Sequence, residues 1–140
     1  MKVRDAMAET IRTVSPGDTI GDAARAMRDE GAGFLPVVDD DRLVGVLTDR
    51  DIVVRCVAEG DGDPRGVKVA DAMSTAVHTI TPDDDLDLAG ERMADDMIRR
   101  LPVVEDGGRL VGILSHGNLV QATGGRGPAW EATTGVTQGA

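Results

Sequence analysis

The sequence is poor in aromatic residues and in cysteine. Aromatic side chains make up 1% of the 140 residues, namely Phe34 and Trp130, and there is no tyrosine. A core must therefore rely on aliphatic side chains and methionine, and a bound base would be held between aliphatic walls rather than aromatic rings. Cys56 is the one cysteine, which excludes an intrachain disulfide and a cysteine-cluster zinc site. We expect Cys56 to pack on the apolar side of a helix.

Basic charge is scarce as well. Asp and Glu number 25 against 15 Lys and Arg, which gives a net charge of −10. Nucleic acids and anionic membranes bind clustered basic side chains, so neither is expected as a partner. No run approaches the ~18 apolar residues of a membrane span, and no apolar leader follows the first residues. We therefore expect a cytoplasmic protein. Any anion that it binds must contact a local group of basic side chains on an otherwise acidic surface.

What the sequence does contain is an internal repeat with an offset of 66 residues. The segment 3–7 aligns with 69–73, and 35–38 aligns with 101–104. One extra residue in an acidic turn then shifts the offset, so that 42–48 aligns with 109–115. The predicted organisation is repeat 1 (1–58), a polar linker (59–68), repeat 2 (69–122) and a tail rich in Gly, Thr and Ala (123–140). The tail is expected to be mobile or to cover a neighbour, with Trp130 either exposed or docked.

The local signals agree between the two repeats. Apolar residues at helical spacing predict a helix from Ile20 to Met27 and another from Leu86 to Met97. Short aliphatic runs around acidic turns predict hairpins over 34–47 and 101–114. Second helices are predicted over 49–58 and 116–122. Each repeat is therefore expected to be β-α-β-β-α, and the fold class to be α/β (α+β).

A hydroxyl residue precedes each of these second helices, in Thr48-x-x-Asp51 and in Ser115-x-x-Asn118. This spacing is typical of a capping box, in which the two side chains bond to free amides at the helix start. Free amides and a hydroxyl also suit an anion or a sugar, and a carboxylate can accept both hydroxyls of a ribose. Both interpretations stay open, because capping and binding are compatible.

Taken together, the two repeats resemble a pair of cystathionine-β-synthase (CBS) domains, the Bateman module. Each repeat has an Asp-Ala-Met start, a Leu-Pro-Val-Val strand and a Gly-apolar-x-Thr/Ser-x-x-Asp/Asn element, in the same order. The resemblance covers residues 3 to about 122. It implies two sheets packed face to face about a pseudo-twofold axis, with two clefts that bind adenosine-containing ligands such as AMP, ADP, ATP or S-adenosylmethionine. Pairs of such modules commonly form a homodimer, so a homodimer is expected.

The resemblance also implies two sets of ligand-binding residues, each drawn from both repeats. The main set consists of Val46, Thr48, Arg50, Asp51, Val77, His78, Ile98, Arg99 and Arg100. The second and weaker set consists of Ile11, Arg12, Ala32, Gly33, Phe34, Ile113, Ser115, His116 and Asn118. Two differences favour the main set. It has the carboxylate of Asp51 where the second set has Asn118, and it has Arg99 and Arg100 where the second set has Gly33 and Phe34. Guanidinium groups bind phosphate bidentately. The alternative to phosphate binding is that Arg99 and Arg100 are merely solvated at a corner between a helix and a strand.

These features predict a non-catalytic, ligand-sensing regulatory module that binds an adenine nucleotide or another adenosine compound and needs no cofactor. The alternative is a dimerisation and docking protein with vestigial clefts and an unidentified protein partner. An enzyme is not expected, since no catalytic motif or Walker loop is present and the repeats and tail account for the whole length. His78 and His116 are either pH-sensitive phosphate contacts or solvated. The clustered aspartates are attributed to solubility and helix dipoles, with no metal expected.

Overall fold

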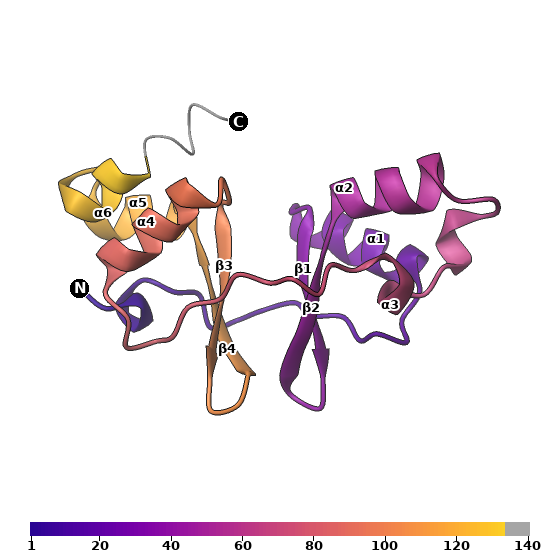
Figure 1. Ribbon diagram of the computed structural model, residues 1–140, viewed down its shortest axis with the longest axis horizontal. Helices are drawn as coiled ribbons and strands as arrows, with labels where there is room; N and C mark the ends of the chain where they lie inside the picture. Colours follow the sequence, from indigo (N-terminus) through magenta and orange to yellow (C-terminus); the bar gives the residue numbers. More distant parts are fainter. Residues whose placement is uncertain (134–140) are drawn as a thin grey trace. The chain divides into compact units, whose positions relative to one another are not determined.

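Residues 1–133 of the chain are described by a computed structural model, and they form two compact units (Figure 1). The continuous unit is Arg12–Val77, and the split unit combines Met1–Ile11 with the chain from His78 onward. The residues that open each sequence repeat thus belong to the unit built mainly from the other repeat. Both units combine helices with an antiparallel hairpin, which confirms the α/β (α+β) class.

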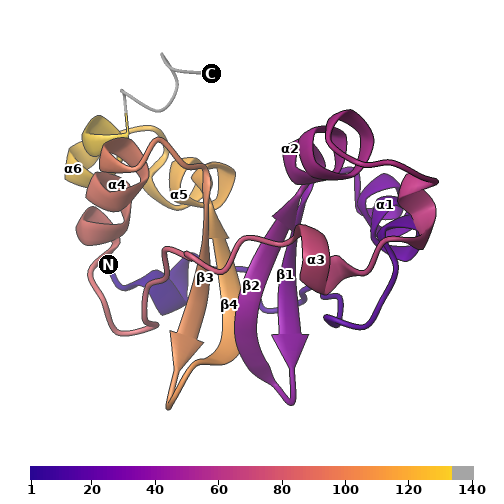
Figure 2. The same ribbon diagram turned by 45° about the vertical axis from the view of Figure 1, so that its right-hand side comes forward.

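A helix, a two-stranded hairpin and a second helix follow one another in both units, and the remaining short elements differ. The continuous unit contains α1 (Ile20–Glu30), β1 (Phe34–Asp39), β2 (Arg42–Thr48), α2 (Asp49–Asp51), the π-helical segment η2 (Ile52–Ala58), the short 3₁₀ helix η3 (Pro64–Gly66) and α3 (Val69–Ala72). The split unit contains the 3₁₀ turn η1 (Val3–Asp5), α4 (Leu86–Asp95), β3 (Arg100–Glu105), β4 (Arg109–Ser115), α5 (His116–Thr123) and α6 (Gly127–Ala132). In each unit the helices that precede and follow the hairpin, α1 and α2 or α4 and α5, lie toward the end of the hairpin away from its turn (Figure 2).

The two hairpins share one register. Leu35 lies opposite Leu47 in β1–β2, and Leu101 lies opposite Leu114 in β3–β4. Each pairing shifts at the same place, after Val37 in one hairpin and after its counterpart in the other. Equal register and equal bulges confirm the repeat alignment. The first strand expected in each repeat is reduced to a single parallel bridge, from Val14 in the continuous unit and from Ile80 in the split unit.

The first long helix of each unit is capped at both ends by local chemistry. The Thr19 hydroxyl accepts a hydrogen bond from the Asp22 amide at the start of α1, and Gly31 ends that helix with a φ of 65°.

In the split unit α4 ends at Asp95. Met97, predicted to extend the apolar stripe, instead has a φ of 54° and a side chain that is 55% exposed. The prediction of a helix reaching Met97 is therefore wrong, because a left-handed residue cannot continue a right-handed helix.

Each unit has its own aliphatic core, closed by a valine from the start of the other repeat. Val69 is fully buried in the continuous core, and Val3 is fully buried in the split core. Cys56 is 2% exposed in the continuous core, and burial raises the pKa of its thiol. The thiol therefore stays protonated and serves as packing, as expected.

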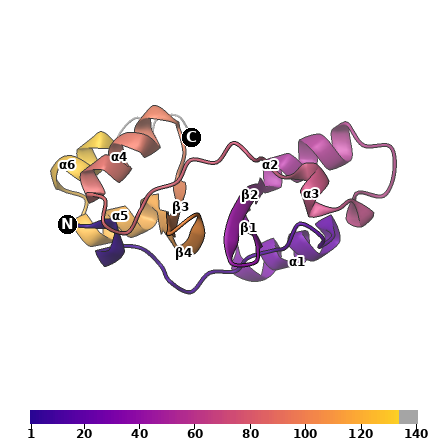
Figure 3. The ribbon, with the colours of Figure 1, turned by 60° about the horizontal axis from the view of Figure 1, so that its bottom comes forward.

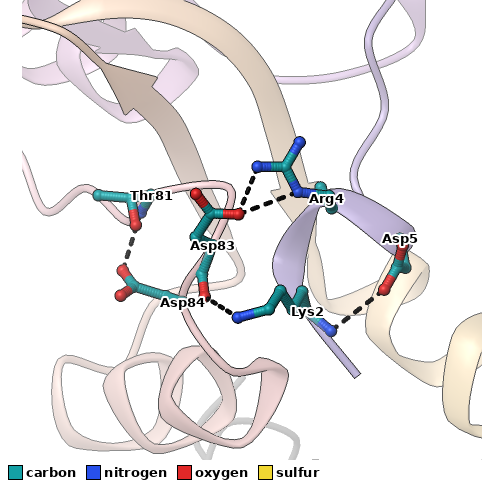
Figure 4. Close-up of polar contacts among 6 residues, drawn as sticks. All are labelled: Lys2, Arg4, Asp5, Thr81, Asp83 and Asp84. Carbon is teal, nitrogen blue, oxygen red and sulfur yellow. Dashed lines mark hydrogen bonds and ion pairs between the residues drawn. The ribbon is translucent and has the colours of Figure 1, made fainter.

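Polar contacts hold the N-terminal segment on the split unit (Figure 4). The Arg4 guanidinium donates to the Asp83 carboxylate, with 3.1 Å between Nε and Oδ1. Lys2 Nζ donates to the Asp83 carbonyl at 2.9 Å. The bond from Arg4 lowers the pKa of Asp83. Because both side chains are largely exposed, this ion pair fixes the position of the segment more than it stabilises the fold.

The part of the tail that is described is held in place. Helix α6 lies beside α4 and α5 (Figure 3), and Ala129 within it is 2% exposed in the split core. Between the two expectations for the tail, residues 127–132 thus cover a neighbour, and Trp130 is docked and partly buried. The remainder, 134–140, lies outside the described residues. Within residues 1–133, none of the helices is long and apolar enough to cross a membrane.

Candidate functional site

The start of α2 carries the hydroxyl and carboxylate that the sequence singled out. Thr48 Oγ1 accepts a hydrogen bond from the Asp51 amide at 3.1 Å, and Asp51 Oδ2 accepts one from the Thr48 amide at 2.9 Å. This is a complete capping box, so the capping interpretation is confirmed. The box engages Oδ2, and a carboxylate has a second acceptor oxygen. Capping therefore leaves the second carboxylate oxygen of Asp51, Oδ1, outside the box.

A segment from the start of repeat 2 runs beside this element within the continuous unit. The Val46 and Ser74 backbones exchange two hydrogen bonds, each 2.9 Å long. Gly45 permits this approach, because a Cβ at that position would stand 2.8 Å from the Ser74 carbonyl oxygen. Arg55 fixes the segment from the other side by donating to the carbonyls of Ala72 and Met73 at 2.8 and 3.0 Å. Val46, Thr48, Arg50, Asp51 and Val77 thus all belong to this unit.

The split unit repeats the construction with one change. Ser115 Oγ accepts from the Asn118 amide at 2.9 Å, and Asn118 Oδ1 accepts from the Ser115 amide at 3.0 Å. The Ile113 and Ala8 backbones exchange hydrogen bonds of 2.9 and 3.0 Å, as Val46 and its partner do. Because the cap uses the one amide oxygen of Asn118, what remains is an NH₂ donor rather than a second acceptor. The two capping boxes thus contain the same bonds, but Asp51 has a further acceptor oxygen where Asn118 has an NH₂ donor.

The residues before each first hairpin strand lie next to the capping element of the same unit. Phe34 pairs with Thr48, and the Asp49 amide donates to the Gly33 carbonyl at 3.0 Å. In the split unit, Arg100 pairs with Ser115. The His116 amide donates to the Arg99 carbonyl at 2.7 Å. The split unit therefore has Arg99 and Arg100 at the positions where the continuous unit has Gly33 and Phe34.

His116 is covered by α6, an arrangement that neither sequence-based alternative included. The ring stacks on Trp130 with 5.7 Å between ring centroids and 29° between planes. Nε2 of His116 lies 3.0 Å from the hydroxyl of Thr133, which is fully buried. Burial, and secondarily the charge of Arg99, lower the pKa of His116. The ring is therefore held neutral beneath α6 instead of being fully solvated.

The second histidine stands in a different environment. His78 remains exposed, and its Nδ1 lies 3.2 Å from Asp96 Oδ2. Across residues 1–133 no group of three or more His, Cys, Asp or Glu side chains is placed to hold a metal ion. Asp40 and Asp41 lie in the turn between β1 and β2, and the Asp84 carboxylate accepts a hydrogen bond from the Thr81 amide at 2.9 Å.

Each predicted ligand set contains residues of both units. From the main set, His78, Ile98, Arg99 and Arg100 belong to the split unit. From the second set, Arg12, Ala32, Gly33 and Phe34 belong to the continuous unit, whereas Ile11, Ile113, Ser115, His116 and Asn118 belong to the split unit. Sequence reasoning missed Ser74 and Arg55, because it could not show which segment lies beside β2. It also missed Thr133, although the lone Trp130 was a signal that the tail docks.

Comparison with known proteins identifies both repeats. The CBS domain family model matches residues 3–58 and 69–125. The CBS domain-containing protein YhcV of Bacillus subtilis is 43% identical over 118 residues, which is 84% of this chain and 81% of that protein.

Two solved structures are also similar. CBSX2 in complex with AMP is 30% identical, with a TM-score of 0.76 over 86% of this chain and 94% of that one. A protein of Methanocaldococcus jannaschii described as an archaeal homologue of g-AMPK is 27% identical, with a TM-score of 0.78. That likeness spans 86% of this chain and 47% of that one.

Proposed function

This chain is a member of the CBS-domain family with two copies of the domain, and on that premise we propose that it is a non-catalytic ligand-sensing module for an adenine nucleotide or another adenosine-containing molecule. The AMP complex of the similar protein CBSX2 supports this ligand class. AMP, ADP, ATP and S-adenosylmethionine are the candidates. The observation that carries the proposal is the capping box of Thr48 and Asp51, which engages one carboxylate oxygen and keeps the other for a ribose.

We assign the ribose to Thr48 and Asp51, with Arg50 on the same turn. A carboxylate accepts hydrogen bonds from both hydroxyls of a ribose, and hydrogen bonds to a charged acceptor are about twice as strong as neutral ones. The main set contains no Phe, Tyr or Trp, so aliphatic side chains would hold the adenine. Val46 and Val77 of the continuous unit and Ile98 of the split unit have that character. Backbone groups would supply the polar contacts to the base.

The phosphates are assigned to Arg99 and Arg100. Adjacent guanidinium groups bind a phosphate through paired charge-assisted bonds, and they supply positive charge in a chain whose net charge is −10. The anionic phosphates therefore bind at Arg99 and Arg100, where basic side chains interrupt the acidic surface. His78 is placed in the same set as a further contact.

The second set should bind more weakly or not at all. Asn118 presents a donor where Asp51 presents an acceptor, and Gly33 and Phe34 stand where the other set has arginines. His116 is in addition held by α6. One ligand per chain is therefore the expected stoichiometry.

The test is isothermal titration calorimetry of the wild-type chain with AMP, ADP, ATP and S-adenosylmethionine. At least one should bind, and the absence of heat with all four at millimolar concentration would contradict the proposal. Replacing Arg99 and Arg100 by Ala should weaken a phosphorylated ligand about 10-fold or more while changing affinity for adenosine little. The charge-matched control replaces two exposed arginines outside the ligand sets, Arg42 and Arg109, by Ala.

The second candidate is a docking protein with vestigial ligand sites. The observation that favours it is the covering of His116 by α6, which closes one element of the second set. Capture of a protein partner that is equal with and without nucleotide, by a chain that shows no calorimetric binding, would support this candidate over the first.

A further inference from the structure

The guanidinium group of Arg55 bonds to the chain that opens repeat 2. Nη1 donates to the carbonyl of Ala72 at 2.8 Å and to that of Met73 at 3.0 Å, and Nη2 lies 3.5 Å from the hydroxyl of Ser74. One planar group therefore contacts three consecutive residues, which the fork of an arginine allows and a single ammonium group does not. The side chain lies at the surface of the continuous unit, so it supplies these bonds without filling the core.

Segment 72–74 is the part of the chain that lies beside β2. Ser74 exchanges two hydrogen bonds of 2.9 Å with Val46, and the chain continues from there to Val77. Both valines belong to the main ligand set, in which they are assigned to the base. The position of segment 72–74 therefore sets where the chain to Val77 starts.

The helix that carries Arg55 also carries the capping box. Asp51 ends α2, and η2 continues from it without a break, so the carboxylate assigned to the ribose and the guanidinium on segment 72–74 are four residues apart on one helix. The Glu59 amide donates to the carbonyl of Val54, five residues back, at 3.0 Å, as in a π-helix. Such turns are rare and are frequently found at functional sites. The helix thus joins the ribose-binding end of the main set to segment 72–74.

The split unit has the same backbone approach without the arginine. Ala8 exchanges hydrogen bonds with Ile113 as Ser74 does with its partner on β2. By the repeat alignment, however, Ala122 corresponds to Arg55, and Ala8 corresponds to Ser74. Position 122 therefore offers no guanidinium and position 8 offers no hydroxyl. The arginine accompanies the unit whose cap is a carboxylate and is replaced in the unit whose cap is an amide.

Bonds to the last carbonyls of a helix also have a purely structural explanation. Ala72 is the last residue of α3, and Met73 is its C-cap. Basic side chains commonly bond to such carbonyls and interact favourably with the helix dipole. The two roles have different consequences, since a cap contributes to stability alone, whereas a positioning residue also sets the affinity for a ligand.

We propose that Arg55 is a positioning residue of the main ligand set, which holds segment 72–74 against β2 so that an arriving ligand meets a preformed site. A preformed segment raises affinity, because the ligand does not have to order the chain as it binds. The inference rests on the proposed function and deepens it: Ala122 is a third difference, beside the amide cap and the missing arginine pair, that makes the second set the weaker one.

Amide hydrogen exchange followed by NMR tests the positioning without any ligand. Arg55→Ala should speed exchange of the Ser74 amide by about 10-fold or more, because local opening of segment 72–74 becomes easier, and should leave the equivalent Ala8 amide unchanged. Thr19→Ala is the control, since it removes the cap of α1 in the same unit and lowers stability without removing a bond to the segment. Exchange at Ser74 that Arg55→Ala leaves unchanged, or that both variants speed equally, would overturn the inference.

Calorimetry with AMP, ADP, ATP and S-adenosylmethionine tests the consequence for the site. The ligand that the wild type binds best should bind about 10-fold more weakly to Arg55→Ala and as tightly as before to Thr19→Ala. Arg55→Lys, which keeps the charge but loses the fork, should lie between wild type and Arg55→Ala. Affinity that Arg55→Ala leaves unchanged would overturn the role of Arg55 in the site. A wild type that binds none of the four would instead contradict the proposed function, and the exchange rates would then decide on the positioning alone.

Discussion

In the continuous unit the helix after β2 begins with a carboxylate cap, and in the split unit the helix after β4 begins with an amide cap. The capping bonds of Asp51 and Asn118 are nevertheless the same, including the hydroxyl that completes each box, although the chain continues as the π-helical η2 after Asp51 and as the α-helix α5 around Asn118. Duplication has therefore preserved the part that folds while the part that would bind has diverged. The helical faces differ in the same way, since α6 closes one of them.

The largest effect should come from the equivalent core leucines. Leu47 and Leu114 are both fully buried at the same register of their hairpins. Leu47→Ala and Leu114→Ala should each lower the free energy of unfolding by about 2–5 kcal/mol, as large-to-small core changes do. Urea denaturation measures both. Effects that differ by more than a factor of two would break the equivalence of the units.

A smaller effect is expected where the units are unequal. Trp130→Ala removes a partly buried ring that stacks on His116 and packs on the split core. The free energy of unfolding should fall by about 1–3 kcal/mol, less than for a fully buried tryptophan. Thermal unfolding by circular dichroism would measure the loss, and an unchanged midpoint would mean that α6 contributes nothing to the stability of the split unit.

The caps should have nearly equal effects. Thr48→Ala and Ser115→Ala each remove a hydroxyl that accepts from a helix amide, at 3.1 and 2.9 Å. Each change should cost about 1 kcal/mol of stability. Chemical denaturation of the two variants is the measurement. If only one of them were destabilised, the two boxes would not be equivalent as caps.

The smallest effect is a pH dependence confined to the split unit. The pKa of His116 is lowered from 6.5 in the folded chain, by burial first and by Arg99 second. The unfolded chain then binds this proton at higher pH, so the contribution of the neutral ring is present above about 6.5 and is lost as pH falls below it. Trp130 fluorescence should shift to the red over that range, and His116→Phe should remove the shift. A shift that persists in the variant would assign the titration to another group.

The sequence predicted the repeat, the hairpins and the helix caps because these depend on local spacing that a duplicated pattern makes visible. The hairpins over 34–47 and 101–114 were predicted on that basis, whereas the register that pairs Leu35 with Leu47 came from the structure. It did not predict that Val3 and Val69 would close the cores of units built mainly from the other repeat, since neither spacing nor propensity encodes which surface a short segment meets. The left-handed Met97 was missed for a related reason: an apolar residue at helical spacing does not reveal where the chain turns.

The residues of the candidate site were likewise predicted only in part. Thr48 and Asp51 were found because their spacing has a mechanism, and the structure confirms the capping bonds. Arg55 and Ser74 carried no signal, because their importance comes from the segment that lies beside β2. Trp130 indicated that the tail docks, because it is a large apolar residue in a polar segment. It did not indicate the contact that the tail makes, which is the stacking of Trp130 on the ring of His116.

Calorimetric titration of AMP into four forms of the chain tests the central claim, which is that the Asp51 element binds the ligand and the Asn118 element does not. The account predicts one site per wild-type chain, at least 10-fold weaker affinity in Asp51→Ala through loss of bonds to a charged acceptor, and little change in Asn118→Ala. Asp49→Ala, a neighbouring carboxylate outside the capping box, controls for the lost charge. Two equal sites per chain, or AMP binding that Asp51→Ala leaves unchanged, would contradict the account.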